Sequence, residues 1–212
     1  MNTQRVDIFE YLNAMTPAAH EALRVLAANL GLHRKQAKSK VISVTSYYPG
    51  EGKTTVAVNL AIVAAKSGIK VLYVDADLRK PLQLKPYGAY TTKGLTDFAE
   101  TSEAEEVLCH TSLETLKFVT VGTRLVDPDE FLGSEVFDQF IEYAAKQYDL
   151  VIIDSPALGT YVDGALIASK ASGVLMITGT ERTTYTEIEC MKSQLEKSGV
   201  TILGIVVNKF NR

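Results

Sequence analysis

A glycine-rich stretch over residues 47–55, Tyr-Tyr-Pro-Gly-Glu-Gly-Lys-Thr-Thr, has the residue types that hold nucleotide phosphates. Glycines let successive backbone N–H groups converge on phosphate oxygens, and a helix that begins here adds the positive end of its dipole. Lys53 is placed to reach the outer phosphates, and Thr54 can offer its hydroxyl to Mg2+. The predicted ligand is ATP with Mg2+, bound by Gly50, Glu51, Gly52, Lys53, Thr54 and Thr55.

This stretch departs from the general phosphate-loop pattern at one point, because Tyr47 stands five residues before Gly52, where glycine is usual. A chance Gly-Lys-Thr tripeptide in a structural turn is the alternative interpretation. The β-rich run 41–45 before it and the helical apolar spacing of 53–66 after it supply the strand, loop and helix that a phosphate site requires. The context therefore favours the phosphate site.

Three carboxylates stand at the ends of two other predicted strands. Asp75 and Asp77 follow the apolar run 70–74, and Asp154 ends the run 150–153. One of the first two could contact Mg2+ through water while the other accepts a proton, and Asp154 would be a second anchor for the metal. Two surface aspartates in a turn would look similar, but the phosphate loop favours the functional interpretation. The spacing alone does not say whether Asp75 or Asp77 is the base.

Asn208 ends the last predicted strand. An amide side chain can pair with both the donor and the acceptor edge of adenine, so Asn208 is a candidate for reading the base. An asparagine that closes the strand through local backbone bonds is the alternative.

The elements that position these residues alternate between strands and helices. Apolar runs near 116–121, 173–178 and 202–207 continue the series, with helical spacing near 134–147, 161–170 and 184–198 between strands. Unbroken Val/Ile/Leu runs are covered on both faces, so the predicted fold is α/β, a doubly wound and mainly parallel sheet of the P-loop NTPase type. Ligands of such sheets bind at the carboxyl ends of the strands.

The N-terminal part lies outside this alternation. Residues 17–30 form an extra amphipathic helix, and 33–40 form a basic segment. We therefore divide the chain into an N-terminal helical extension with a basic linker, 1–40, and a nucleotide-binding domain, 41–212. Short helices are expected around 95–99 and 102–109.

The composition of the 212 residues excludes several classes of protein. A net charge of −3 gives no general attraction to nucleic acid, and no nucleic-acid partner is predicted. The two cysteines are far apart and are expected to be reduced thiols in a cytoplasmic protein. No apolar run of about 18 residues and no signal peptide is present, so any membrane association is expected to come from a partner.

Five segments resemble, in their order and approximate spacing, those of the bacterial tyrosine kinases of capsule and exopolysaccharide synthesis, a branch of the deviant-Walker P-loop ATPases. They are residues 49–54, 75–81, 94–97, 127–134 and 154–156, and the resemblance covers residues 16–209. The division-site and partition ATPases share the fold but usually carry a second lysine early in the phosphate loop. Tyr47, Tyr48 and Pro49 occupy that stretch here, which favours the kinase branch. The hydroxyls of Tyr47 and Tyr48 could be phosphorylation substrates, but we expect the two rings to pack over the loop.

The resemblance implies an ATP-dependent protein-tyrosine kinase. Lys53 and Thr54 would hold the phosphates and Mg2+, and Asp77 and Asp154 would belong to the metal shell. Asp75 would accept the proton of a tyrosine hydroxyl. It also implies three partners: a membrane-embedded polysaccharide copolymerase that activates the kinase, a protein tyrosine substrate, and further copies of the chain in a ring or dimer. The protein would then work at the inner face of the membrane through that partner.

Two departures from the family pattern keep other functions open. The family's oligomerisation motif, Glu-x-x-Arg-x-x-Arg, is matched by Glu21 and Arg24 but has Ala27 at its third position. The family's C-terminal tyrosine cluster has no counterpart, since the last tyrosine is Tyr185. An ATP-driven assembly switch without protein phosphorylation is therefore the second hypothesis. A non-catalytic regulatory module is the third, and the intact Lys53 and carboxylates argue against it.

Overall fold

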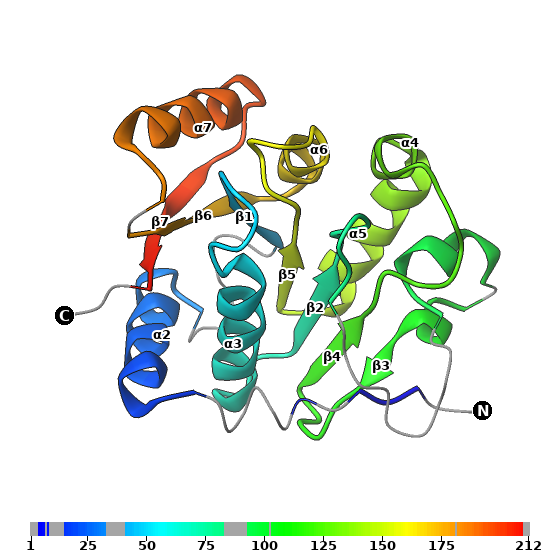
Figure 1. Ribbon diagram of the computed structural model, residues 1–212. Helices are drawn as coiled ribbons and strands as arrows, with labels where there is room; N and C mark the ends of the chain where they lie inside the picture. The colour runs from blue at the N-terminus through cyan, green and yellow to red at the C-terminus, as the bar shows by residue number, and fades with distance from the viewer. Residues whose placement is uncertain are drawn as a thin grey trace.

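The chain builds one seven-stranded sheet with helices on both faces (Figure 1). The structure is a computed structural model. It describes residues 4–6, 8, 15–32, 41–82, 93–101, 103–180 and 182–209. The predicted basic segment 33–40 lies outside the described residues, so its expected role as a linker stays a prediction.

The strand order confirms the predicted doubly wound, mainly parallel sheet. The sheet runs β3-β4-β2-β5-β1-β6-β7, and only the short β3 is antiparallel to its neighbour. The strands are β1 (Val41–Ser46), β2 (Val71–Asp75), β3 (Cys109–His110), β4 (Leu116–Val119), β5 (Leu150–Asp154), β6 (Gly173–Gly179) and β7 (Ile202–Asn208).

Every residue of β1, β2, β5 and β6 is buried, as their mainly apolar sequences predict. In the parallel register Asp75 of β2 lies beside Asp154 of β5, and Val44 of β1 lies on the other side of Asp154. The sheet therefore brings two strand-end carboxylates next to the strand that leads into the phosphate loop.

Helices cover the two faces of the sheet unequally (Figure 1). The buried apolar residues of one face include those of α2 and α3, and the buried apolar residues of the other face include those of α5, α6 and α7. The helices are α2 (Pro17–Asn29), α3 (Lys53–Lys66), α4 (Pro128–Leu132), α5 (Glu135–Gln147), α6 (Asp163–Lys170) and α7 (Tyr185–Lys197).

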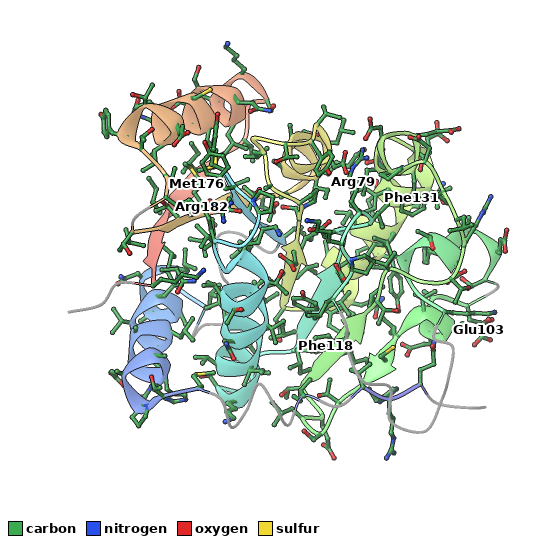
Figure 2. The ribbon with its side chains drawn as sticks, viewed as in Figure 1. Arg79, Glu103, Phe118, Phe131, Met176 and Arg182 are labelled. Atoms are coloured by element: carbon green, nitrogen blue, oxygen red, sulfur yellow. The ribbon has the colours of Figure 1, made fainter. Side chains whose placement is uncertain are left out.

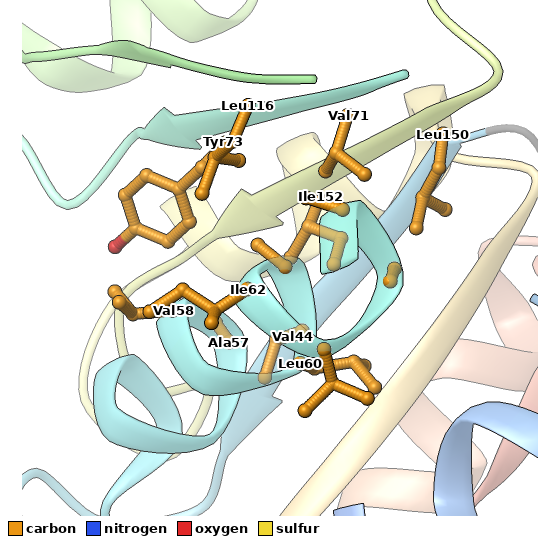
Figure 3. Close-up of a cluster of buried hydrophobic side chains, with 14 of the residues drawn as sticks. Val44, Ala57, Val58, Leu60, Ile62, Val71, Tyr73, Leu116, Leu150 and Ile152 are labelled. Atoms are coloured by element: carbon orange, nitrogen blue, oxygen red, sulfur yellow. The ribbon is translucent and has the colours of Figure 1, made fainter. Parts of the chain in front are cut away.

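Helix α3 is apolar around most of its circumference because it is packed from two sides. Figure 3 shows Ala57, Leu60 and Ile62 facing strand residues that include Val44 and Ile152. Its other side is covered by α2, which contributes to the same core. This double burial fixes the helix whose first turn carries Lys53 and Thr54.

The position of Ala27 explains one departure from the family pattern. Ala27 is buried at 7% exposure and belongs to the core between α2 and the sheet. Glu21 and Arg24 lie on the exposed side of the same helix and form an ion pair of 3.7 Å. A small side chain at position 27 lets α2 lie close against its neighbours.

The stretch before β4 differs from the expected helices. Residues near 95–99 and 102–109 form two 3₁₀ helices, η1 (Leu95–Glu100) and η2 (Ala104–Val107), and Cys109 already belongs to β3. The buried Asp97 carboxylate binds the backbone N–H groups of Gly94 and Thr123, at 2.8 and 2.9 Å, so side-chain bonds fix a tight local turn. Residues 83–92 lie outside the described part.

Helix α4 was not predicted, although the sequence carries its signal. Asp127 caps the helix by accepting the N–H groups of Asp129 and Glu130, and Pro128 occupies its first position. Within the described part of the chain, no helix has the length and apolar character needed to cross a bilayer.

Candidate nucleotide-binding site

The loop between β1 and α3 adopts a conformation that only glycine tolerates at two points. Gly50 and Gly52 have φ angles of 84° and 91°, in the left-handed region. A Cβ on Gly52 would lie 2.1 Å from the Asn208 amide nitrogen. The glycine pattern therefore reflects both backbone shape and the close approach of β7.

Lys53 begins α3 and points to the carboxylates at the strand ends. Its side chain is almost fully buried, and its Nζ lies 3.3 Å from Asp77 Oδ2. The other Asp77 oxygen accepts the N–H of Lys80 at 3.0 Å. The structure thus joins Lys53 and Asp77, two residues that the sequence analysis placed in one site.

Asp75 is the most perturbed acid of the site. It is 2% exposed, and its two oxygens accept the backbone N–H groups of Asp77 at 3.2 Å and of Leu82 at 2.7 Å. Burial, followed by the charge of Asp154, raises the pKa of Asp75 to about 8. This carboxyl therefore holds a proton near neutral pH more readily than an ordinary aspartic acid.

Asp154 has one oxygen bound and one oxygen without a hydrogen bond. Its Oδ2 accepts the Tyr73 hydroxyl at 3.1 Å, while its buried Oδ1 has no hydrogen-bond partner. Burial raises the pKa of Asp154 to about 6, and the charge of Lys53 and the Thr54 hydroxyl act in the opposite direction. An orphaned carboxylate oxygen at this depth is a free ligand position.

This arrangement fits Mg2+ held together with phosphate. Thr54, Asp77 and Asp154 would hold the ion, which favours oxygen ligands and keeps several waters. Among the described residues, no cluster of three His, Cys, Asp or Glu side chains could hold a metal ion alone.

Glu51 uses its carboxylate to brace the loop. The side chain is 1% exposed and accepts the N–H of Tyr48 at 2.9 Å, the N–H of Gly179 at 3.0 Å and the Thr183 hydroxyl. A nucleotide contact at this position would therefore come from the backbone N–H. Glu51 was predicted to bind the nucleotide, and its bracing role was not predicted.

The ends of β6 and β7 supply three further side chains to the loop. Arg182 donates to the carbonyl of Pro49 at 2.7 Å, and Lys209 to the carbonyl of Gly50 at 2.8 Å. The Asn208 amide donates to the carbonyl of Glu51 at 2.9 Å. Figure 2 shows Arg182 beyond the end of β6. Asn208 thus contacts the phosphate loop, while its contact with adenine stays a prediction. The contacts of Arg182 and Lys209 with the loop were not predicted.

The rings of Tyr47 and Tyr48 contact each other beside the phosphate loop, and Tyr47 packs against the apolar core that includes residues of α6 and α7, so the expected packing over the loop stays a prediction. Their rings meet edge to face at 4.8 Å, and the Arg182 guanidinium lies 5.3 Å from the centre of the Tyr48 ring. The Tyr48 hydroxyl donates to Glu187, and this hydrogen bond raises the pKa of Tyr48. Both rings therefore belong to the contacts between the loop and its surroundings.

Arg79 anchors the segment that follows β2. Its guanidinium donates to Asp163 at 2.7 and 3.0 Å and to Asp129 at 2.8 Å, and it lies 4.3 Å from the centre of the Tyr161 ring. Figure 2 shows Arg79 between α6 and α4. Because Arg79 is two residues beyond Asp77, this ion-pair network fixes the chain that carries the acids. Arg79 lies in the segment 75–81 that resembles the kinase family, and its anchoring role was not predicted.

Comparison with known proteins agrees with this geometry. Residues 39–198 match the family model described as an AAA domain. The chain is 36% identical over 198 residues to the tyrosine-protein kinase CpsD of Streptococcus pneumoniae serotype 4, covering 91% of this chain and 85% of that protein.

Among solved structures, a tyrosine kinase domain is more similar to the chain than a division ATPase is. The kinase domain of the Escherichia coli tyrosine kinase ETK is similar with a TM-score of 0.84 and 28% identity, over 100% of this chain and 85% of that one. The cell division ATPase MinD of Pyrococcus furiosus is similar with a TM-score of 0.65 and 27% identity, over 82% of this chain and 73% of that one. The chain therefore belongs to the bacterial tyrosine-protein kinases of the P-loop NTPase type.

Proposed function

We propose that the chain transfers the γ-phosphoryl group of ATP to the hydroxyl of a protein tyrosine. One observation carries the proposal: Asp75, with a pKa of about 8, lies in register beside Asp154 at the strand ends that adjoin the phosphate loop. A buried acid with a pKa near the working pH is suited to accept a proton during the reaction.

The binding roles follow from the positions of the side chains. Backbone N–H groups of Gly50, Glu51 and Gly52 would bind the phosphates, and Lys53 would move from Asp77 to the outer phosphates. Bound Mg2+ would neutralise charge that develops on the transferred group. Thr54 and Asp154 are the other residues that would hold this ion.

Asp75 is favoured over Asp77 as the base because the two carboxylates have different partners. Asp77 already faces the Lys53 ammonium at 3.3 Å, so its carboxylate is engaged with a cation of the phosphate site. The oxygens of Asp75 accept hydrogen bonds from two neutral backbone N–H groups, those of Asp77 and Leu82, and burial raises the pKa of this carboxyl. Asp75 would take the tyrosine proton, and Asp77 would serve the metal.

The acceptor is a tyrosine on a partner protein or on another copy of the chain. Tyr73 and Tyr148 are buried, which removes them as acceptors in the folded protein. Tyr185 is 76% exposed at the first turn of α7. Within the described residues, Tyr185 is therefore the tyrosine most open to a second copy.

The setting that best suits this chemistry is capsule or exopolysaccharide synthesis, by analogy with the family. A membrane-embedded copolymerase would activate the kinase and hold it at the inner face of the membrane. The exposed Glu21 and Arg24 on α2 are the candidate contacts between copies in a ring or dimer.

The test is to incubate the protein with Mg-ATP, alone and with the cytoplasmic peptide of a candidate activator, and to map phosphotyrosine by mass spectrometry. Lys53→Met is the matched control. Phosphotyrosine that depends on Lys53 is the expected result. ATP hydrolysis without phosphotyrosine, even with the activator, would reject the kinase in favour of the assembly switch.

A further inference from the structure

Three consecutive carbonyl groups of the phosphate loop are each held by a different side chain. The carbonyls of Pro49, Gly50 and Glu51 accept hydrogen bonds of 2.7, 2.8 and 2.9 Å, and the donors are Arg182, Lys209 and Asn208, respectively. We infer that this carbonyl clamp, the side chains of Arg182, Asn208 and Lys209, sets the loop in its phosphate-binding shape.

Peptide geometry converts the clamp into an orientation of N–H groups. In a trans peptide the C=O and the next residue's N–H point in opposite directions, and the chain contains no cis peptide among the described residues. The carbonyls of 49, 50 and 51 share peptide units with the N–H groups of Gly50, Glu51 and Gly52. Holding the carbonyls on one side therefore turns these three N–H groups to the other side.

The clamp also strengthens the N–H groups as donors. Arg182 and Lys209 are cations, and charge-assisted hydrogen bonds are shorter and stronger than neutral ones. A carbonyl polarised by a cation makes the N–H of the same peptide unit more positive, because hydrogen bonds in a chain polarise one another. A loop held in this way attracts phosphate better than a loop whose carbonyls face water.

The close fit of the clamp indicates that it is a specific arrangement. Lys209 has a φ of 58°, a left-handed conformation that is uncommon outside glycine and costs energy. A Cβ at Gly50 would lie 3.3 Å from an Arg182 nitrogen, and a Cβ at Gly52 would lie 2.1 Å from the Asn208 amide. The two glycines therefore make room for the clamp residues.

The three residues are positioning residues, since they act on the phosphates through the loop. This role differs from a contact between Asn208 and adenine, because it requires neither base nor ribose. The inference rests on the proposed nucleotide site, and a ligand that consists of phosphates alone separates the two roles.

The experiment measures the affinity of Mg-ATP and of inorganic tripolyphosphate by titration calorimetry. The variants are Arg182→Ala, Asn208→Ala and Lys209→Ala. Lys192→Ala is the control. Lys192 is an exposed cation on α7 that forms a long ion pair of 3.8 Å with Glu189. We expect both ligands to lose affinity in parallel, by roughly fivefold to tenfold per variant, as for the loss of one hydrogen bond. The control should stay within about twofold, a difference well below 1.4 kcal/mol.

Conservative variants separate a loss of loop shape from a loss of folding. Arg182→Lys and Lys209→Arg keep a cationic donor and should recover most of the affinity at an unchanged melting temperature. In the alanine variants, amide exchange at residues 50–52 should be faster, and the affinity loss should exceed the loss in kcat at saturating ATP.

Two results would overturn the inference. If tripolyphosphate binds the three alanine variants as tightly as the parent protein while ATP binding weakens, the residues contact the base or ribose. If neither ligand changes, the clamp has no role in binding. If Lys53→Met binds both ligands as tightly as the parent protein, the loop is not the phosphate site and the proposed function fails. If Lys53→Met weakens binding and the three alanine variants do not, only the clamp inference fails.

Discussion

The phosphate loop lies between two regions that are prepared for a nucleotide in opposite ways. On the side of β2 and β5, Asp75 and Asp154 lie in register at the strand ends, Asp77 faces the Lys53 ammonium, and one Asp154 oxygen has no hydrogen bond. We call this the acidic side. On the side of β6 and β7, the loop carbonyls and the Glu51 carboxylate all have donors.

This difference separates chemistry from shape. The acidic side gathers buried carboxylates whose negative charge a bound metal ion would neutralise, so its residues should matter for turnover and should lower stability in the empty protein. We call the side of β6 and β7 the clamp side. Its hydrogen-bonding groups have partners without a ligand, so its residues should matter for affinity and should raise stability. Substitutions on the two sides should therefore have opposite effects on folding.

The largest effect is expected from Asp75→Asn. An amide cannot accept the tyrosine proton, so kcat should fall by roughly 10²–10⁴-fold while the affinity for ATP changes little. The measurement is steady-state phosphorylation of a tyrosine peptide, together with ATP titration. If kcat falls by less than about tenfold and Asp77→Asn abolishes transfer instead, the roles of the two acids are reversed.

The pH dependence of the free energy of unfolding should reveal the raised pKa of Asp75. Its pKa rises from 3.8 to about 8 on folding, so the folded state holds this proton more tightly than the unfolded state. The stabilisation is complete below pH 4 and is lost as pH rises through about 8. Between pH 6 and 8, we expect the free energy of unfolding of the parent protein to fall by about 2 kcal/mol relative to that of Asp75→Asn. This window lies above the pKa of about 6 of the neighbouring Asp154.

Denaturant unfolding at several pH values measures this difference, and Asp97→Asn is the matched control. Asp97 is also buried, but its carboxylate accepts three donors from Gly94 and Thr123 at 2.8–2.9 Å. Its replacement should destabilise the protein because an amide has one acceptor atom for these three donors. A pH-independent difference between the parent and Asp75→Asn would contradict the raised pKa.

On the clamp side, Glu51→Gln should act in the opposite direction. The carboxylate accepts from Tyr48, Gly179 and Thr183, and an amide offers only one acceptor atom to these three donors. A buried donor left without a partner costs about 1–3 kcal/mol, so stability should fall by that amount. ATP affinity should fall with it, and kcat at saturation should change less. An unchanged unfolding free energy would remove Glu51 from the bracing role.

The sequence predicted the acidic side better than the clamp side, for a physical reason. Lys53, Asp75, Asp77 and Asp154 each follow or begin an apolar element, and parallel strands bring their carboxyl ends to one edge. Strand type and order thus suffice to bring these four together. The contact of Arg182 with Pro49 joins residues 133 positions apart and depends on the path of the chain after β6.

Local structure was predictable only where backbone bonds decide it. The 3₁₀ turn at η1 depends on the Asp97 carboxylate reaching Thr123, 26 positions away, which no local pattern encodes. The network of Arg79 with Asp163 and Asp129 likewise joins three segments distant in sequence. The short helix α4, in contrast, begins with Asp127-Pro128, an N-terminal signal that could have been used.

The smallest effect is expected from Tyr48→Phe, which tests how far the clamp side extends. The substitution removes the hydroxyl that donates to Glu187 and keeps the ring that lies edge to face with Tyr47 and near Arg182. Glu187 also accepts from the N–H and hydroxyl of Thr184 at 2.7 and 2.9 Å, so the cap of α7 persists without Tyr48. The melting temperature should therefore fall by no more than about 2 °C, and tripolyphosphate affinity should stay within about twofold. A loss as large as that of Arg182→Ala would show that the Tyr48 hydroxyl, through Glu187, helps to set the shape of the phosphate loop.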